Sequence, residues 1–333
     1  MTNRQIVLLS YPKGMPQEAD FAIRDLPMPK PQEGGDVLVK TLYLSMDPYI
    51  RGRMSEKPSY MARFDIGSTP EGDGIGEVVE SHNPKLKTGD IVTGYLKWAE
   101  FSTEKAVDLQ VIKPNGLPVT TALDVLGMTG MTAYFGLLDI GKPQAGETVV
   151  ISAAAGSVGS MAGQIAKIKG ARVIGIAGGK DKISYLTKEL HFDAALDYKS
   201  PSFAAELKKA CPKGVNVYFD NVGGDVSDAV EALLARHARI ILCGQISQYN
   251  LETPDFGPRP FVNFLIKGVL LKGFSVNEYQ EHYPKAKEEI AQWIKEGKIK
   301  FRENITKGLE HIPEAFIGLF KGKNIGKQII KVA

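Results

Sequence analysis

Cysteine is scarce in this sequence, and histidine is scattered along it. The 333 residues include two cysteines, Cys211 and Cys243, and five histidines. Two cysteines exclude a disulfide framework and a four-cysteine zinc site, and they indicate a reducing compartment. A catalytic zinc is normally held by cysteine and histidine, but no two histidines stand at the spacing of metal ligands. We therefore expect no functional metal.

Long apolar runs and an excess of one charge are also missing. The longest apolar stretch, 261–274, is interrupted by Lys267 and Gly268, which excludes a membrane-spanning helix. The apolar stretch before Pro12 is too short for a secretory signal. The formal net charge of +3 comes from both signs interspersed along the chain, which is typical of a solvated surface and not of a nucleic-acid interface. We expect a cytoplasmic protein that binds neither nucleic acid nor membranes.

What the sequence does contain is two successive patterns of secondary structure. The first part reads as short strands rich in β-branched and aromatic residues, with glycine, proline, asparagine and aspartate between them, which is typical of a compact β-barrel. From about Gly127, strand-like and helix-like stretches alternate, which predicts βαβ units and a parallel sheet. The final helix and strand fit best with the first domain. We predict a domain at 1–126 completed by 305–333, and an inserted domain at 127–304.

A motif of small residues marks the first strand-to-helix turn of the inserted domain. Ala153 ends the predicted strand TVVISA, Gly156 and Gly159 follow it, and a helix is expected to begin near Ser157. Such a turn lets backbone N–H groups and the positive end of the helix approach a diphosphate, and Gly159 lets the helix pack on the strand. Small residues at a turn can also serve packing alone. Within a series of βαβ units, however, the motif predicts dinucleotide binding.

The end of the next strand bears on which dinucleotide binds. NAD sites usually carry an acidic residue there, about 20 residues beyond the glycines, to bind the ribose 2′-hydroxyl. Here the stretch reads AGGK at 177–180, and Lys180 and Lys182 can supply positive charge to a 2′-phosphate. Asp181 argues the other way, and the lysines could simply be solvated at the start of a helix. We interpret the pattern as an NADP site.

Other catalytic patterns are missing from the chain. No G-x-S-x-G motif of a serine hydrolase appears, and the glycine-rich stretch GDGIGE at 72–77 is interpreted as a turn. With neither a nucleophile motif nor a metal site, hydride transfer without a metal is the chemistry that remains.

Six stretches spread along the chain carry a resemblance to a known family. They are LSMDPYIRGRM (44–54), GMTGMTAYFGL (127–137), AAAGSVGSMAGQIAK (153–167), YFDNVGG (218–224), CGQISQYN (243–250) and KNIGKQI (323–329). On these stretches the chain resembles the medium-chain dehydrogenase/reductase superfamily, and within it the zinc-independent leukotriene B4 12-hydroxydehydrogenase/prostaglandin reductase group. That group includes alkenal double-bond reductases and curcumin-reductase-like enzymes. The MDPY stretch stands about where zinc-dependent relatives carry their first metal ligand.

The resemblance implies an α/β protein: a GroES-like, barrel-type substrate domain around a Rossmann domain with a doubly wound parallel sheet, and NADPH bound in the cleft between them. It favours Lys182 over Lys180 for the phosphate. It also implies a homodimer formed through the edge strand VLLKGFSV. The cofactor contacts that it implies are Gly156, Ser157, Val158, Gly159, Lys182, Tyr198, Asn221, Cys243, Gly244, Ile246, Ser247, Phe274, Ser275, Val276 and Asn324.

The reaction that the resemblance implies is reduction of the carbon–carbon double bond of an α,β-unsaturated ketone or aldehyde. Hydride transfer to the β-carbon builds negative charge on the carbonyl oxygen, which needs a neutral hydrogen-bond donor when no metal is present. A tyrosine hydroxyl suits this role because its pKa of about 10 keeps it protonated. Tyr249 and Tyr49 are the candidates, although each could be only a wall of the pocket. Arg51 and Arg53 are interpreted as structural, unless one of them meets an acidic group of the substrate.

Two other functions remain open at this point. One is an NADPH quinone oxidoreductase, which would share the fold and the cofactor. The other is a protein that binds NADPH without turning it over.

Overall fold

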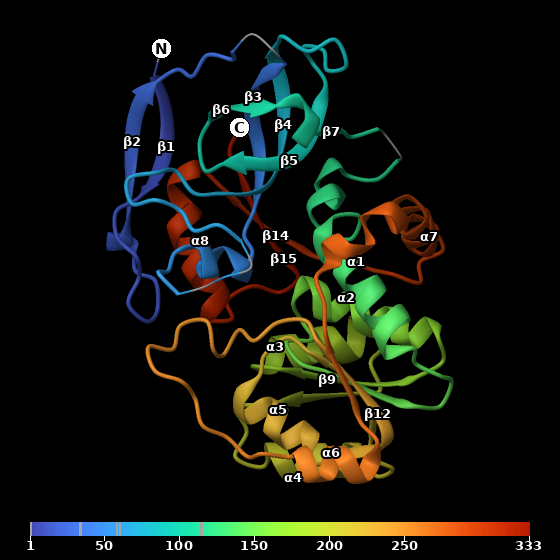
Figure 1. Cartoon of the computed structure of the whole chain (residues 1–333). Coiled ribbons are helices and arrows are strands. Elements are labelled where there is room, and N and C mark those ends of the chain that lie inside the picture. The colour runs from blue at the N-terminus through green and yellow to red at the C-terminus, as the bar shows by residue number, and fades with distance from the viewer. Residues whose placement is uncertain (1, 33–34, 58, 60, 114–115) are drawn as a thin grey trace. The chain divides into compact units, whose positions relative to one another are not determined.

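The computed structural model describes residues 2–32, 35–57, 59, 61–113 and 116–333, and in it the chain forms two compact units (Figure 1). Unit 1 comprises Met1–Leu123 and Glu303–Ala333, and unit 2 comprises Asp124–Arg302, so unit 2 is inserted into unit 1. The boundaries expected from the sequence are 126/127 and 304/305. No helix among the described residues is long and apolar enough to cross a membrane.

Unit 1 is built on a mainly antiparallel sheet. Its strand order is β14 (Glu303–Lys307), β15 (Lys327–Lys331), β3 (Asp36–Ser45), β4 (Glu71–Ser81), β5 (Ile91–Lys97) and β7 (Gln110–Val111), with β6 (Phe101–Lys105) also paired to β3. The strands β1 (Thr2–Leu8) and β2 (Phe21–Pro27) form a separate hairpin. Because β15 pairs with β3, the end of the chain completes the sheet that its beginning starts. Helix α8 (Ile312–Phe320) packs its Phe316 ring against Trp98 and Phe21 in the core.

The stretch at 72–77 is a strand, which corrects its interpretation as a turn. It forms the first part of β4 and pairs with both β3 and β5. A side chain at Gly76 would come within 2.2 Å of Val39, and one at Gly74 within 2.9 Å of Leu96. The glycines are therefore needed because neighbouring side chains cross the strand closely, not because the chain reverses there.

Unit 2 contains a six-stranded parallel sheet. Its order is β10 (Ala194–Asp197), β9 (Arg172–Ala177), β8 (Thr148–Ile151), β11 (Val215–Asp220), β12 (Leu234–Leu242) and β13 (Leu270–Gly273). The first three strands in sequence run outward in one direction and the next three in the other, which is the Rossmann order 3-2-1-4-5-6. The direction reverses between β8 and β11, and dinucleotides bind at the carboxyl ends of the strands at this point.

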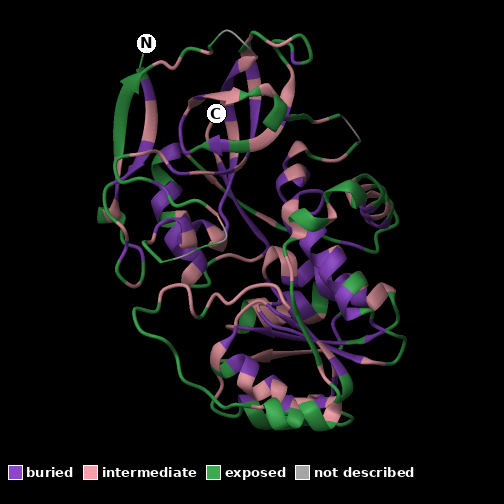
Figure 2. Ribbon diagram, in the orientation of Figure 1, coloured by how far each residue is buried: buried purple, intermediate pink, exposed green. Residues whose placement is uncertain are grey.

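Helices connect and cover these strands. They are α1 (Met128–Phe135), α2 (Ser157–Ile168), α3 (Lys180–Ser184), α4 (Phe203–Ala210), α5 (Gly224–Glu231), α6 (Phe261–Lys267) and α7 (Tyr283–Lys295). Figure 2 shows the middle of the parallel sheet buried and α6 exposed. Helix α2 is largely buried, because small residues line it: a side chain at Gly163 would meet the Phe192 ring at 2.0 Å.

Candidate functional site

The turn between β8 and α2 carries the glycine motif. Ala153 has a left-handed backbone with φ of 48°, which is uncommon for a residue with a side chain. The Gly156 N–H donates to the Ala153 carbonyl at 3.0 Å, directly before the helix begins at Ser157. A side chain at Gly159 would meet the Ala153 oxygen at 2.5 Å, so glycine is required for this close approach. The positive end of α2 therefore stands at the carboxyl edge of the sheet, where a diphosphate can bind.

The Ser157 hydroxyl is used within unit 2. It donates to the Asp124 carboxylate, and its oxygen lies 2.9 Å from the Thr129 hydroxyl, which itself donates to the Asp124 carbonyl at 3.0 Å. These bonds tie the first residue of α2 to the segment before α1. Because the hydroxyl already bonds within unit 2, we expect Ser157 to bind a phosphate through its backbone N–H.

The turn after β9 gathers two lysines and a tyrosine. A side chain at Gly178 would come within 2.8 Å of the Tyr198 ring and 3.1 Å of the Lys199 stem, so both pack against the Gly178 backbone. Burial, and then the charge of Lys199, lowers the pKa of Lys182, which indicates that the two ammonium groups are neighbours. Lys182 is half-buried, whereas Lys180 is exposed. This cluster can bind a 2′-phosphate.

Lys199 is a candidate that the sequence reading missed. It follows β10, and β10 pairs in parallel with β9, with Asp197 opposite Ala177. The carboxyl ends of parallel neighbours meet at one edge of the sheet, so a lysine after the third strand reaches the turn after the second. Asp197 fixes both turns, because its carboxylate accepts the N–H groups of Gly179 and Lys199, each at 3.0 Å. The sequence feature that points to Lys199 is its position directly after Tyr198, which is itself a predicted cofactor contact.

Asp220, at the end of β11, organises the other half of the sheet edge, and the sequence reading missed it as well. Its side chain is 1% exposed. The carboxylate accepts hydrogen bonds from the side chains of Ser152 (3.0 Å), Tyr218 (2.8 Å), Ser227 (2.9 Å) and Gln245 (2.7 Å) and from the N–H groups of Val222 (2.9 Å) and Gly223 (3.0 Å). A buried carboxylate with this many donors fixes the turns after β8, β11 and β12 relative to one another.

Asn221 and the loop after β12 are held at the same edge. The Asn221 side chain donates to the Ser152 carbonyl and its N–H to the Ser152 hydroxyl, both at 2.8 Å. The N–H groups of Cys243 and Gly244 donate to the Asp220 carbonyl at 2.9 and 3.1 Å. The structure therefore brings the predicted residues of these two turns together with the glycine motif.

Tyr249 folds back over its own loop. Its hydroxyl oxygen accepts the Gln245 N–H at 3.1 Å, and a side chain at Gly244 would meet that oxygen at 3.3 Å. Burial, more than any charge nearby, raises the pKa of Tyr249. The phenol thus stays protonated at neutral pH, and because it accepts from the backbone, its own hydrogen is left for an acceptor elsewhere.

Strand β13 leads into the predicted segment 274–276. The Phe274 ring lies against Gly136, where a side chain would meet it at 2.8 Å, and packs edge-on with Tyr279 at 6.3 Å between ring centres. Ser275 forms a capping box with Glu278 at the start of the next helical turn. The backbone of this segment is thereby fixed at the end of the last strand of the sheet.

The remaining candidates, Tyr49 and Asn324, belong to unit 1. Tyr49 lies in a short 3-10 helix, η2 (Pro48–Arg53), and its hydroxyl donates to the Asp73 carboxylate at 3.4 Å. Burial and then the charges of Asp73 and Asp47 raise the pKa of Tyr49. Asn324 donates from its side chain to the Gly326 carbonyl at 2.8 Å.

The two arginines of η2 serve the fold of unit 1. Arg51 donates to the carbonyls of Met54 (3.0 Å), Pro12 (2.9 Å) and Gly14 (3.0 Å). Arg53 pairs with Glu71 at 2.9 Å and lies over the Phe64 ring, 3.9 Å from its centre. Both are buried, and these contacts support their interpretation as structural residues.

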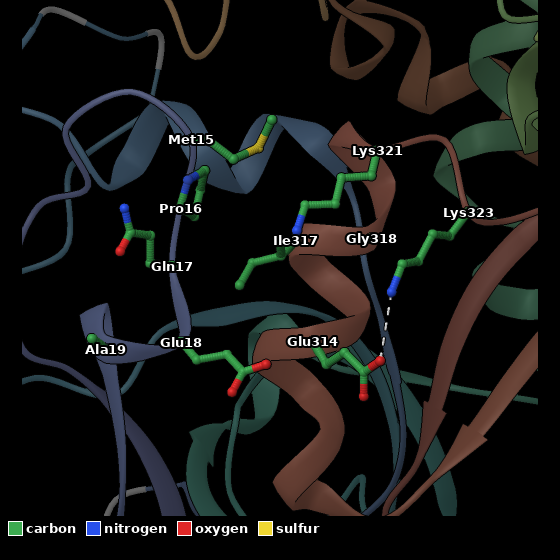
Figure 3. A pocket seen from close by; sticks show the side chains of 10 residues that line it. All are labelled: Met15, Pro16, Gln17, Glu18, Ala19, Glu314, Ile317, Gly318, Lys321 and Lys323. Carbon is green, nitrogen blue, oxygen red and sulfur yellow. Dashed lines mark ion pairs between the residues drawn. The ribbon is translucent and has the colours of Figure 1, made fainter.

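A separate hollow in unit 1 lies between the segment 15–19 and α8 (Figure 3), with a cavity volume of about 520 Å³. Its rim carries both signs of charge, and Lys323 pairs with Glu314 across 3.7 Å. None of the site residues predicted from the sequence lines it.

The fold and the sheet edge of unit 2 define a dinucleotide-binding protein of the Rossmann class. Two family models match it: the N-terminal domain of oxidoreductase at residues 4–112, and zinc-binding dehydrogenase at residues 157–292. The chain belongs to the medium-chain dehydrogenase/reductase superfamily, in the prostaglandin reductase and alkenal reductase group that the motifs predicted.

Three similar proteins support this assignment. NADPH-dependent curcumin reductase of Escherichia coli is 46% identical over 99% of this chain and 97% of its own length. The NADP(+)-dependent 2-alkenal reductase of Nicotiana tabacum is 41% identical over 100% and 98%. The crystal structure of CurA from Vibrio vulnificus in complex with NADPH is 42% identical, with a TM-score of 0.94 over 99% of each chain.

The description of the second family model names zinc. Among the residues that the structure describes, no three histidine, cysteine, aspartate or glutamate side chains are grouped so as to hold a metal ion. We therefore assign no step to a metal.

Proposed function

We propose that this protein reduces the carbon–carbon double bond of α,β-unsaturated ketones and aldehydes with NADPH. The observation that carries the proposal is the lysine-lined turn after β9, in a chain that resembles the NADPH-dependent curcumin reductase over nearly its whole length. When bound, NADPH supplies the hydride.

The cofactor-binding residues divide by the part of NADPH that they would hold. The first turn of α2, at 156–159, would take the diphosphate, and Lys182, Tyr198 and Lys199 would take the 2′-phosphate. Asn221, the loop from Cys243 to Ser247, the backbone at 274–276 and Asn324 would hold the nicotinamide half. Asp220 would act indirectly, by fixing the two turns that carry Asn221 and that loop.

The substrate oxygen needs a hydrogen-bond donor as hydride reaches the β-carbon, because negative charge develops on it. Tyr249 and Tyr49 both keep their protons at neutral pH, since burial raises the pKa of each. Tyr249 is the better candidate of the two, because its hydroxyl oxygen accepts the Gln245 N–H, whereas the Tyr49 hydroxyl donates to Asp73.

The test is NADPH oxidation with a panel of enones, enals and quinones, followed by product analysis. A saturated ketone or aldehyde as product supports the proposal, whereas a hydroquinone as the favoured product assigns a quinone oxidoreductase. If NADPH stabilises the protein but no acceptor oxidises it, the chain is a binding protein.

We also infer a homodimer formed through β13 and α6. Strand β13 is the last strand of the described sheet, and α6 beside it exposes Phe261, Val262, Leu265 and Ile266 by 64–82%. An apolar patch of this kind beside a sheet edge suits a second copy of the same chain, paired about a two-fold axis.

The dimer can be tested by mutation of this patch. Leu265→Glu should shift the mass measured by light scattering from that of a dimer to that of a monomer. Ile66→Glu, at an exposed position in unit 1, is the control and should leave the mass unchanged. A monomeric wild type would refute the dimer.

A cytoplasmic location is a further inference. Both cysteines are free thiols, with Cys211 buried, as a reducing compartment allows. Recovery of the native protein in a membrane or secreted fraction would contradict it.

A further inference from the structure

Asp73 lies beside the Tyr49 hydroxyl in unit 1, and three elements bring this cluster together. Asp73 on β4 is directly opposite Tyr95 on β5 in the antiparallel register, so the two side chains share a face of the sheet. Tyr49, from η2, donates to Asp73 Oδ2 at 3.4 Å and also hydrogen-bonds the Tyr95 hydroxyl. Asp73 is half-buried and Tyr95 is 41% exposed, so the cluster meets solvent on one side.

The other charged groups around this cluster are already paired. From the segment before η2, Asp47 accepts from Ser45 and forms a buried ion pair with Lys327 of β15. On β4, Glu71 pairs with Arg53 of η2 at 2.9 Å. Among the described residues, Asp73 forms no ion pair of its own. Burial and then Asp47 raise the pKa of Asp73 to about 6, although Lys327 and the bond from Tyr49 act against the rise.

The ionised and the protonated forms of Asp73 make different hydrogen bonds with the Tyr49 hydroxyl. An ionised carboxylate only accepts, so it draws the single hydrogen of the Tyr49 hydroxyl toward itself. A protonated carboxyl can donate to the Tyr49 oxygen instead. The tyrosine hydrogen then turns away from Asp73, toward the Tyr95 oxygen or toward a substrate oxygen that takes its place.

We propose that Asp73 controls, through Tyr49, a hydrogen bond to the carbonyl oxygen of the substrate, and that the protein with protonated Asp73 reduces enones faster. This role rests on the proposed function, and it makes Asp73 a positioning residue. No proton leaves Asp73 in the reaction: its hydrogen bond to Tyr49 only reverses direction.

The test compares kcat/KM for one enone between pH 5.5 and 8.0 in the wild type and in Asp73→Asn, each corrected for the acid decay of NADPH. The wild-type value should fall by more than tenfold as Asp73 ionises, because with a midpoint near 6 the protonated fraction drops from most of the protein at pH 5.5 to about 1% at pH 8.0. Asp73→Asn, whose amide can donate to Tyr49 at every pH, should give a flat profile within about threefold of the wild-type value at pH 5.5. Tyr49→Phe should be flat and low. Asp25→Asn, an exposed aspartate on β2, is the control and should follow the wild type.

A second measurement does not depend on turnover. Carbon-13 NMR of aspartate-labelled protein, with the Asp73 signal identified by its absence in Asp73→Asn, should show a midpoint near 6. A midpoint near the ordinary aspartate pKa of about 4 would overturn the proposal. So would an Asp73→Asn profile that still falls with pH, or one that is low throughout. A wild type that reduces no enone at any pH refutes the proposed function itself, and the role of Asp73 with it; enone reduction with an unchanged pH profile in Asp73→Asn refutes only the role of Asp73.

Discussion

The sheet edge of unit 2 and the Tyr49 cluster of unit 1 are two different ways to build polar chemistry into this chain. At the edge of unit 2, most contacts run through backbone N–H and carbonyl groups of turns that directly follow strands, and one buried carboxylate, Asp220, joins them. In unit 1 the cluster is made of the side chains of Tyr49, Asp73 and Tyr95 from three distant segments, and the charges of Asp47 and Lys327 are buried together beside it. The first arrangement depends on local turn geometry, and the second on long-range packing.

If unit 1 depends on its buried charges, breaking one pair should cost much stability. Lys327→Met would leave the Asp47 carboxylate buried without its cation, and we expect a loss of about 3–5 kcal/mol in the free energy of unfolding. Urea denaturation measures it. The control is Glu314→Gln, which removes the exposed pair with Lys323 and should cost less than about 1 kcal/mol. If both variants lose the same free energy of unfolding, burial of the Asp47–Lys327 pair does not add to the stability of unit 1.

The two tyrosines offer a second comparison. Tyr249→Phe keeps the ring and removes one donor, so kcat and kcat/KM should fall together by about 10²-fold with KM nearly unchanged. A drop of about tenfold would indicate that a second donor, such as Tyr49 or the cofactor ribose hydroxyl, shares the role. Full kcat in Tyr249→Phe would make Tyr249 a wall of the pocket and leave Tyr49 as the donor.

Substitution of the lysines after β9 and β10 tests whether this part of the sheet edge binds the 2′-phosphate of NADPH. Lys182→Ala and Lys199→Ala should each weaken NADPH by about tenfold or more and NADH far less, because a charge-assisted bond to the 2′-phosphate is lost. Lys180→Ala, at an exposed position in the same turn, is the matched control and should change neither affinity by more than about twofold. Titration calorimetry with both cofactors measures this. Equal weakening of NADPH and NADH would contradict the assignment.

Removal of metal should have the smallest effect. Elemental analysis should find well under one zinc per chain, and enone reduction should survive strong chelators, because no described group of side chains forms a ligand set. Stoichiometric zinc, or activity lost on chelation and restored by zinc, would contradict the mechanism without a metal.

The sequence by itself determined what depends on short stretches of chain. The alternation of strands and helices predicts the parallel sheet, and the spacing of Ala153, Gly156 and Gly159 predicts the turn onto α2, because a close backbone approach admits only certain residue types. The terminal strand could be assigned to the first domain, and it pairs with β3. The group to which the chain belongs was identified from six motifs of the same local kind.

Tertiary structure alone decided the rest. The sequence predicts a turn at GDGIGE because glycine occurs both in turns and in crowded strands, and only Val39 and Leu96, packed across it, distinguish the two. Lys199 could not be assigned beside Lys182 until the register of β10 on β9 was known. Asp73 has no local signal, since its proximity to Tyr49 and its raised pKa arise where β4, β5 and η2 meet, and burial is a property of packing that a short stretch of sequence does not contain.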